Sequence, residues 1–262
     1  MAQSGATPTI GIIGVGQLAA HLVEGFCGAE GPPKILLSPR SKDRAQALSS
    51  RFSLQIAADN QAVLDGAGLI ILAVPPGDAV DVAASLDFKT SHVVVCVAAG
   101  VNLEPVAQAA SPAATVRAMP VTSAAVRESA TVLYPDHAAA RAALAHLGTV
   151  HAFDTEAQFE IAMVIATYYG WVFALMAEAA DWLAEHDIDP AEAKRLVAQM
   201  TRGVCAMCME GAKDMASEGR EIGRAGTFTG MGLDKLERMD ALSAWRETLE
   251  AVLEATRRGR AD

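Results

Sequence analysis

The first half of the chain alternates short, uninterrupted apolar runs with amphipathic stretches. The apolar runs end in Gly, Pro or Ser and suit strands of a parallel sheet that is covered on both faces. They are Thr9–Gly14, Lys34–Ser38, Gly68–Val74, His92–Gly100 and Ala114–Pro120. Segments with helical character lie between them: Gln17–Gly28, Ser41–Phe52, Asp78–Ser85 and Leu103–Ala110. This alternation predicts an α/β domain with a Rossmann-type, doubly wound parallel sheet.

The pattern changes near residue 153. Ala130–Pro135 and Gly148–Phe153 could add edge strands around a helix over Ala138–Leu147. From Thr155 onward we expect only helices: Thr155–His186, a second that opens at Pro190 and runs to about Ser217, and Ala241–Arg258. We therefore expect a dinucleotide-binding domain over residues 1–153 and an all-helical domain over residues 154–262.

The first apolar run leads into a G-x-G-x-x-A sequence at the start of a predicted helix, Gly14 to Ala19. The first glycine permits a tight turn, the second lets the backbone approach a pyrophosphate, and the small alanine lets helix and strand pack closely. Phosphate would lie over the helix N-terminus. The motif predicts dinucleotide binding at Gly14, Gly16, Gln17 and Leu18; the alternative is a turn with a purely structural role.

The end of the second strand indicates which dinucleotide is bound. NAD sites usually place Asp or Glu there to hold the ribose hydroxyls. Here the chain reads Ser38-Pro39-Arg40-Ser41-Lys42, without a carboxylate and with two cations. Ser38, Arg40 and Ser41 suit the 2′-phosphate of NADP(H). The alternative is that Arg40 and Lys42 are solvated residues that open a helix.

The composition limits which binding partners and which cellular compartment we expect. The chain has 262 residues, of which 52% are hydrophobic, and a net charge of −10, so it has no overall positive field for nucleic acid or anionic lipid. Four cysteines, and a start (MAQSGATPT) without an apolar signal-peptide core, predict a reduced, cytoplasmic protein. The six histidines show no metal-ligand spacing, and we expect no metal.

The stretch Ile161–Ala177 is free of charge and borderline in length for a membrane span. Glu160 and Glu178 bound it, and no basic cluster flanks it. We expect no membrane partner and a helix buried on all sides, within the fold or in a subunit interface.

The order of motifs resembles the pyrroline-5-carboxylate reductase family, which makes proline by reducing a cyclic imine with a nicotinamide cofactor. The segments that carry the resemblance are IGIIGVGQLAAHLVEG, LSPRS, LAVPP, VAAGVNLEPV, RAMPVTSAAV and AGTFTGMGLDKLE, in the family's order across nearly the whole chain. The resemblance implies an NADP-binding domain, a helical domain through which subunits dimerise, and an active site at the junction of the two. The apolar helix Thr155–His186 would then be an interface helix of a homodimer or a multiple of dimers.

The resemblance also assigns residues to cofactor and substrate. Val74 and Pro75 would run past the nicotinamide ribose, and Ala98, Ala99 and Gly100 would border the ring. The family's substrate loop, Pro-Gly-Gly-Thr-Thr, corresponds to residues 224–228, Arg-Ala-Gly-Thr-Phe, of which only Gly226 and Thr227 match the family. This implies that Ala225, Gly226 and Thr227 bind the imino-acid carboxylate, with Thr227 as the candidate catalytic contact. The alternative is a structural, Gly-containing loop between helices.

Two departures from the family fall on the presumed pocket. Val121 stands in Met119-Pro120-Val121 where the family has an asparagine near the nicotinamide. Residues 165–171 bring bulky aromatic side chains to a segment that is small in the family. Tyr168 and Tyr169 could supply the missing polar contacts to substrate, or could be core residues.

The favoured function is therefore NADPH-dependent reduction of a small cyclic imino acid, giving proline or an analogue. Two alternatives stay open: a family relative acting on a different imine or carbonyl substrate, and a non-catalytic NADP-binding protein. A 3-hydroxyacid dehydrogenase is disfavoured, because it relies on a lysine early in its helical domain and no lysine occurs between residues 151 and 193.

Overall fold

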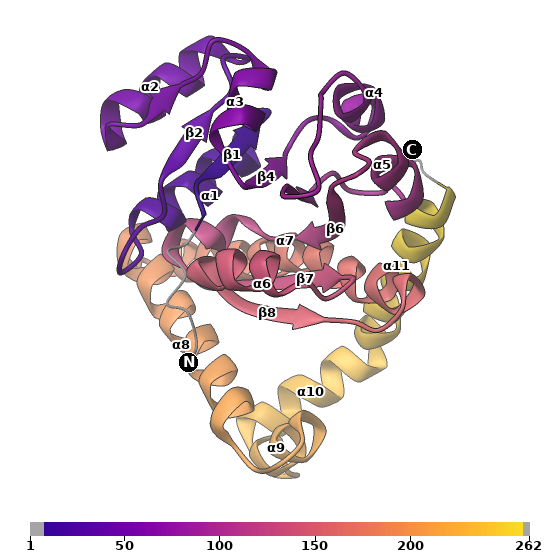
Figure 1. Cartoon of the computed structure of the whole chain (residues 1–262). Helices are drawn as coiled ribbons and strands as arrows, with labels where there is room; N and C mark the ends of the chain where they lie inside the picture. Colours follow the sequence, from indigo (N-terminus) through magenta and orange to yellow (C-terminus); the bar gives the residue numbers. More distant parts are fainter. Residues whose placement is uncertain (1–7, 259–262) are drawn as a thin grey trace. The chain divides into compact units, whose positions relative to one another are not determined.

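The computed structural model describes residues 8–258 (Figure 1). The chain forms two compact units. The first contains the chain up to Ala166 together with the segment from Leu253 onward, and the second is Thr167–Val252.

The first unit is built on a mostly parallel, eight-stranded sheet, which confirms the predicted fold class. The strand order is β3-β2-β1-β4-β5-β6-β7-β8. The strands are β1 (Ile10–Ile13), β2 (Ile35–Leu37), β3 (Gln55–Ile56), β4 (Leu69–Leu72), β5 (Val93–Cys96), β6 (Ala114–Met119), β7 (Ser129–Tyr134) and β8 (Gly148–Ala152).

Helices cover both faces of this sheet (Figure 1). They are α1 (Gln17–Cys27), α2 (Lys42–Phe52), α3 (Asn60–Gly66), α4 (Ala79–Ala84), α5 (Leu103–Ala109) and α6 (Ala138–Leu144), with short 3-10 turns η1 (Pro76–Asp78), η2 (Thr122–Val126) and η3 (Ala145–Leu147). Core residues of α1, α2 and α6 belong to one apolar cluster, and those of α3, α4 and α5 belong to the other.

Burial on both faces explains why the central strands read as continuous apolar runs. In β4, Leu69 and Ile71 point into the cluster around α1, whereas Ile70 and Leu72 point into the cluster around α3. All four residues are buried. Each such side chain contributes about 1.5–3 kcal/mol of burial free energy, so β4 has no position left for a polar residue.

Several elements differ from the expected pattern. β7 runs antiparallel to β6, which makes the sheet mixed at this edge. β3 and α3 were not predicted. β3 has only two residues, too few to show a period, and α3 starts at Asp59, whose carboxylate accepts the N–H of Ala62 at 2.8 Å.

The helices that follow β8 are α7 (Glu156–Glu185), α8 (Pro190–Glu210), α9 (Met215–Ile222), α10 (Phe228–Arg238) and α11 (Ala241–Arg258). The expected helix from Pro190 to about Ser217 was wrong at its end. α8 ends before Gly211. α9 begins after Asp214, which caps it by accepting the N–H of Ser217 with its carboxylate. α10 was not predicted.

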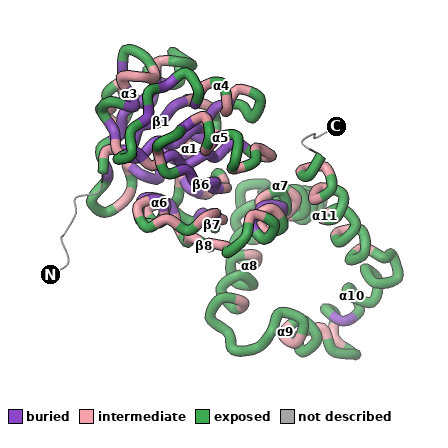
Figure 2. Tube along the Cα trace, turned by 45° about the vertical axis from the view of Figure 1, so that its right-hand side comes forward, coloured by how far each residue is buried: buried purple, intermediate pink, exposed green. Residues whose placement is uncertain are grey.

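Few side chains of these helices are buried within the chain (Figure 2). α9 and α11 have no buried residue, and α8 has only Ala193. In α7 the buried residues are Phe159, Met163 and Val164, all in its first turns. The expectation that this helix is buried on all sides is therefore wrong for the single chain, because much of its apolar surface is exposed. Among the described helices, α7 alone meets the length and composition test for a membrane span, a weak indication taken by itself.

Candidate functional site

The loop between β1 and α1 depends on its first glycine. Gly14 has φ +93°, and a Cβ at this position would lie 2.6 Å from the carbonyl oxygen of Ala73, at the end of β4. Ser38, fully buried at the end of β2, accepts the N–H of Gly14 with its Oγ at 3.0 Å. Three neighbouring strand ends thus fix the conformation of this loop.

The second glycine leaves open space in front of α1. A Cβ at Gly16 would meet no atom within 4 Å, and no side chain caps the helix that begins at Gln17. The N–H groups of the first turn have no acceptor within their own helix. Gly16, Gln17 and Leu18 therefore offer donors, the positive end of a helix dipole and room for a pyrophosphate, so this loop fits a dinucleotide.

The end of β2 combines a cation with a carboxylate. Arg40 is exposed, and its Nη1 lies 3.7 Å from Oδ2 of Asp78 in the turn after β4. The two side chains line a shallow hollow of about 240 Å³ together with Asp81, Val82 and Ser85. Ser41, next to Arg40, has φ +68° and starts α2. Neither Asp78 nor Asp81 was recognised from the sequence as part of this region.

The ends of β4 and β5 complete the sheet edge. Val74 is buried, whereas Pro75 is exposed and accepts the N–H of Asp78 at 2.9 Å. After β5, Ala98 is buried, Ala99 is exposed, and Gly100 has φ +72° with no atom within 4 Å of a Cβ. All the predicted cofactor residues thus follow strands β1, β2, β4 and β5, which are parallel neighbours, so the fold brings them to one edge.

Two residues at this edge are fixed by their surroundings. Burial raises the pKa of the Cys96 thiol, which keeps it protonated. Val121 follows β6, and its N–H donates to Oγ of Ser129 at 3.1 Å.

The loop that contains Gly226 and Thr227 belongs to the second unit. Gly226 has φ +83° and a Cβ there would meet no atom within 4 Å. Thr227 caps α10, because its Oγ1 accepts the N–H of Gly230 at 2.9 Å and lies 2.8 Å from the carbonyl oxygen of Arg224, to which it donates. Ala225 is exposed beside it. The Thr227 hydroxyl thus already has a donor and an acceptor partner in the loop.

The two tyrosines lie in a group of aromatic rings on α7 and α11. Tyr168 packs edge-on against Trp171 and Trp245, with ring centroids 6.5 and 5.6 Å away. Tyr169 meets Phe173 at 5.1 Å. The residues predicted from the sequence to bind substrate therefore fall into two groups. Val121 belongs to the first unit, and the tyrosines and residues 225–227 belong to the second.

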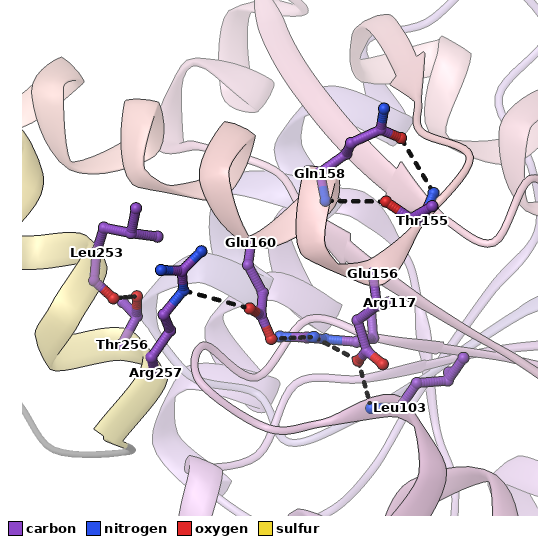
Figure 3. A network of polar contacts seen from close by, with 9 residues as sticks. All are labelled: Leu103, Arg117, Thr155, Glu156, Gln158, Glu160, Leu253, Thr256 and Arg257. Atoms are coloured by element: carbon purple, nitrogen blue, oxygen red, sulfur yellow. Dashed lines mark hydrogen bonds and ion pairs between the residues drawn. The ribbon is translucent and has the colours of Figure 1, made fainter.

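A polar network that joins β6, α7 and α11 was not predicted (Figure 3). Arg117 of β6 is buried and pairs with Glu156 and Glu160 of α7, and Glu160 lies 4.0 Å from Arg257 of α11. The sequence signal was an arginine inside an apolar strand, with two glutamates four residues apart further along the chain. Among residues 8–258 no group of three or more His, Cys, Asp or Glu could hold a metal ion.

A strand-loop-helix cradle for a dinucleotide at the edge of a doubly wound sheet, followed by a helical unit, defines a class: NAD(P)-binding oxidoreductases of Rossmann type. Two family models match the chain in series. "NADP oxidoreductase coenzyme F420-dependent" matches residues 9–100, and "Pyrroline-5-carboxylate reductase dimerisation" matches residues 156–260. Within this class, the two matches together with the relatives below support membership of the pyrroline-5-carboxylate reductase family.

Known proteins agree with this assignment. The chain is 26% identical over 240 residues to pyrroline-5-carboxylate reductase 2 of Bacillus subtilis, covering 87% of this chain and 86% of that protein. Its fold is similar to that of pyrroline carboxylate reductase of Plasmodium falciparum with NADP bound (TM-score 0.85, 19% identity, 98% and 99% of the two chains). It is also similar to an imine reductase from Pseudomonas sp. (TM-score 0.60, 18% identity, 96% and 93%).

Proposed function

We propose that this protein is an NADPH-dependent imine reductase that acts on a small cyclic imino acid, giving proline or a close analogue. One observation carries the proposal: the dinucleotide cradle and the helical part occur in one chain that matches a pyrroline-5-carboxylate reductase over 87% of its length. The bound cofactor supplies a hydride to the carbon of the C=N bond. The chain's own contribution is binding and orientation, since an imine can arrive already protonated.

The preference for NADP(H) rests on Arg40. Its exposed guanidinium lies at the end of β2, where an NAD site would usually carry an acid, and Ser41 adds a hydroxyl. The roles of Ser38 and Val74 are to shape the edge rather than to contact the 2′-phosphate, because both are buried. Pro75, Ala99 and Gly100 offer the accessible surface along the ribose and the nicotinamide.

The substrate carboxylate is proposed to lie at the start of α10. Thr227 is the first choice for its contact, but the Thr227 hydroxyl already donates within the loop. We therefore assign part of the binding to the N–H groups of Phe228 and Thr229, which lie in the first turn of an 11-residue helix. Ala225 and Gly226 keep the approach to this turn open, since neither carries a bulky side chain.

We further propose that the protein is a homo-oligomer in the cytoplasm. A dimer is supported by the match of residues 156–260 to a dimerisation family and by the apolar surface that the helices leave uncovered. The cysteines Cys27, Cys96, Cys205 and Cys208 are all free, which suits a reducing compartment.

Turnover by the purified protein tests the activity. Loss of NADPH absorbance with 1-pyrroline-5-carboxylate supports the proposal. Turnover only with other imines or with carbonyl compounds favours a family relative of different specificity, for which the aromatic group around Tyr168 and Trp245 is the supporting observation. NADPH binding without turnover across the whole panel favours a non-catalytic protein.

The variant Gly16→Val tests the cofactor site. Gly16 has φ −81°, which any residue can adopt, and open space in front of it. The variant should keep the melting temperature of the wild type while its NADPH affinity falls by about 10-fold or more, because the side chain blocks the pyrophosphate. Wild-type affinity in this variant would show that the cofactor does not bind over α1.

A further inference from the structure

A buried arginine lies beside the loop that follows β5. Arg117 is 3% exposed, and its Nη1 lies 2.6 Å from Oε1 of Glu156. Its guanidinium stacks on the ring of Phe159, 4.6 Å from the centroid, and a second carboxylate, Glu160, lies 3.9 Å away. Removing a charge from water is costly unless it is paired. The guanidinium is therefore confined between strand β6 and the first turns of α7.

The same carboxylate of Glu156 holds the start of α5. Its Oε1 accepts the N–H of Leu103 at 2.8 Å (Figure 3). Leu103 is the first residue of α5, and Asn102, at the usual capping position, makes no side-chain capping bond. The first N–H groups of a helix have no partner within it. Glu156 thus supplies, from α7, a cap that α5 does not supply for itself.

Arg117 is linked in this way to both ends of the loop 97–102. At one end, it pairs in register with Cys96, the last residue of β5. At the other end, it orients the carboxylate that holds Leu103. Between these anchors, Ala99 is exposed and Gly100 adopts φ +72° beside open space. The loop has fixed ends and an accessible middle.

We propose that Glu156, oriented by Arg117, is a positioning residue that fixes the loop 97–102 against the nicotinamide. This inference rests on the proposed function, in which Ala98, Ala99 and Gly100 border the ring. Glu156 does not touch the reacting atoms; it acts through the backbone of Leu103. A misplacement of about 1 Å can cost on the order of 100-fold in rate. Releasing the loop should therefore lower kcat and leave the adenosine end of the site, at Arg40, unaffected.

Amide hydrogen exchange of the full chain, without cofactor or substrate, tests the anchor itself. In Glu156→Ala, the N–H of Leu103 should exchange about 10-fold faster or more, because its acceptor is gone. In Glu156→Gln the side-chain amide oxygen can still accept, and exchange should stay within about 3-fold of the wild type. Glu160→Gln is the matched control, since it removes a carboxylate near Arg117 without touching Leu103.

Kinetics test the consequence for the cofactor. Glu156→Ala should lower kcat by about 10- to 100-fold and change the KM for NADPH by less than about 3-fold. Glu156→Gln should recover most of the lost rate, and Glu160→Gln should resemble the wild type. If Glu156→Ala does not fold, the double variant Arg117→Met/Glu156→Ala removes the unpaired charge and carries the same expectations.

The fluorescence of bound NADPH gives a readout even if no imine is turned over, because it reports the surroundings of the nicotinamide. It should change in Glu156→Ala and stay as in the wild type in Glu160→Gln. Such a change without turnover would sustain the positioning role while the proposed activity fails. Wild-type exchange at Leu103 in Glu156→Ala, or equal effects of Glu156→Ala and Glu160→Gln, would overturn the inference.

Discussion

At Arg40, the side chain on which the proposed cofactor preference depends already has a partner. Asp78 lies 3.7 Å away, and the Arg40 and Asp78 side chains are 66% and 44% exposed. A bound 2′-phosphate would have to share the guanidinium with this carboxylate and would be repelled by it. An exposed pair of this kind contributes about 0.2–1 kcal/mol. Asp78 should therefore moderate the preference for NADPH over NADH without reversing it.

Steady-state kinetics with both cofactors check this residue-scale prediction. Arg40→Ala should lower kcat/KM for NADPH by about 10-fold or more and leave the value for NADH nearly unchanged. Asp78→Asn should raise kcat/KM for NADPH by about 2- to 5-fold. Arg51→Ala, which removes an exposed arginine of α2, is the control. An unchanged NADPH to NADH ratio in Arg40→Ala would refute the assignment of the second strand.

A buried histidine in the turn before β5 should make the free energy of unfolding depend on pH. His92 is buried, and its Nδ1 accepts the N–H of Lys89 at 3.0 Å. Burial, together with the nearby charge of Lys89, lowers the pKa of His92. The unfolded chain, with an ordinary pKa of about 6.5, therefore binds the proton more readily than the folded chain. The stabilisation that neutral His92 contributes is fully present above pH of about 6.5. It is lost as the pH falls from this value toward the lower pKa of His92 in the folded chain.

Urea unfolding between pH of about 8 and 5.5 measures this element-scale effect. The wild-type free energy of unfolding should fall as the solution is acidified. In His92→Asn, whose side-chain oxygen can still accept from Lys89, the fall should be smaller. His151→Asn, at an exposed histidine, should follow the wild type. Parallel curves for His92→Asn and the wild type would show that His92 does not contribute.

At the scale of the whole molecule, the helical part has more apolar surface than one chain can cover. Leu175 of α7 is 58% exposed and borders two apolar hollows of about 330 and 480 Å³, one beside Trp171 and Trp245 and the other beside Trp182. The proposed dimer, in which a second copy of the chain covers this surface, would explain an apolar helix in a chain of net charge −10.

Sedimentation of Leu175→Glu tests the proposed dimer. An unpaired carboxylate in a buried interface costs about 2 kcal/mol or more, so the dissociation constant should rise by at least about 30-fold. Leu175→Met, which conserves volume and polarity, should associate like the wild type. A wild-type protein that sediments as a monomer would instead leave the exposed face of α7 without an explanation.

The sequence by itself determined the elements whose signal is local. A strand covered on both faces is composed mainly of apolar residues, so the uninterrupted apolar runs Ile10–Ile13 and Leu69–Leu72 can be recognised from the sequence alone. Gly14 is similarly readable, because its backbone conformation and close contact leave room for no side chain. Elements with weak local signals were not predicted. The strand β3 has only two residues and so no period, and the break at Gly211 lies in a stretch whose composition is typical of a helix.

Only the tertiary structure decided which distant residues meet. Ser38 supports Gly14 across 24 residues, and Arg117 reaches Glu156 across 39. Asp78 faces Arg40 because β2 and β4 both lie next to β1 in a parallel sheet. Such pairs depend on strand order and helix placement, which hydrophobic periodicity does not encode. The sequence therefore predicts where a cofactor would bind, and the tertiary structure shows what holds that loop in shape.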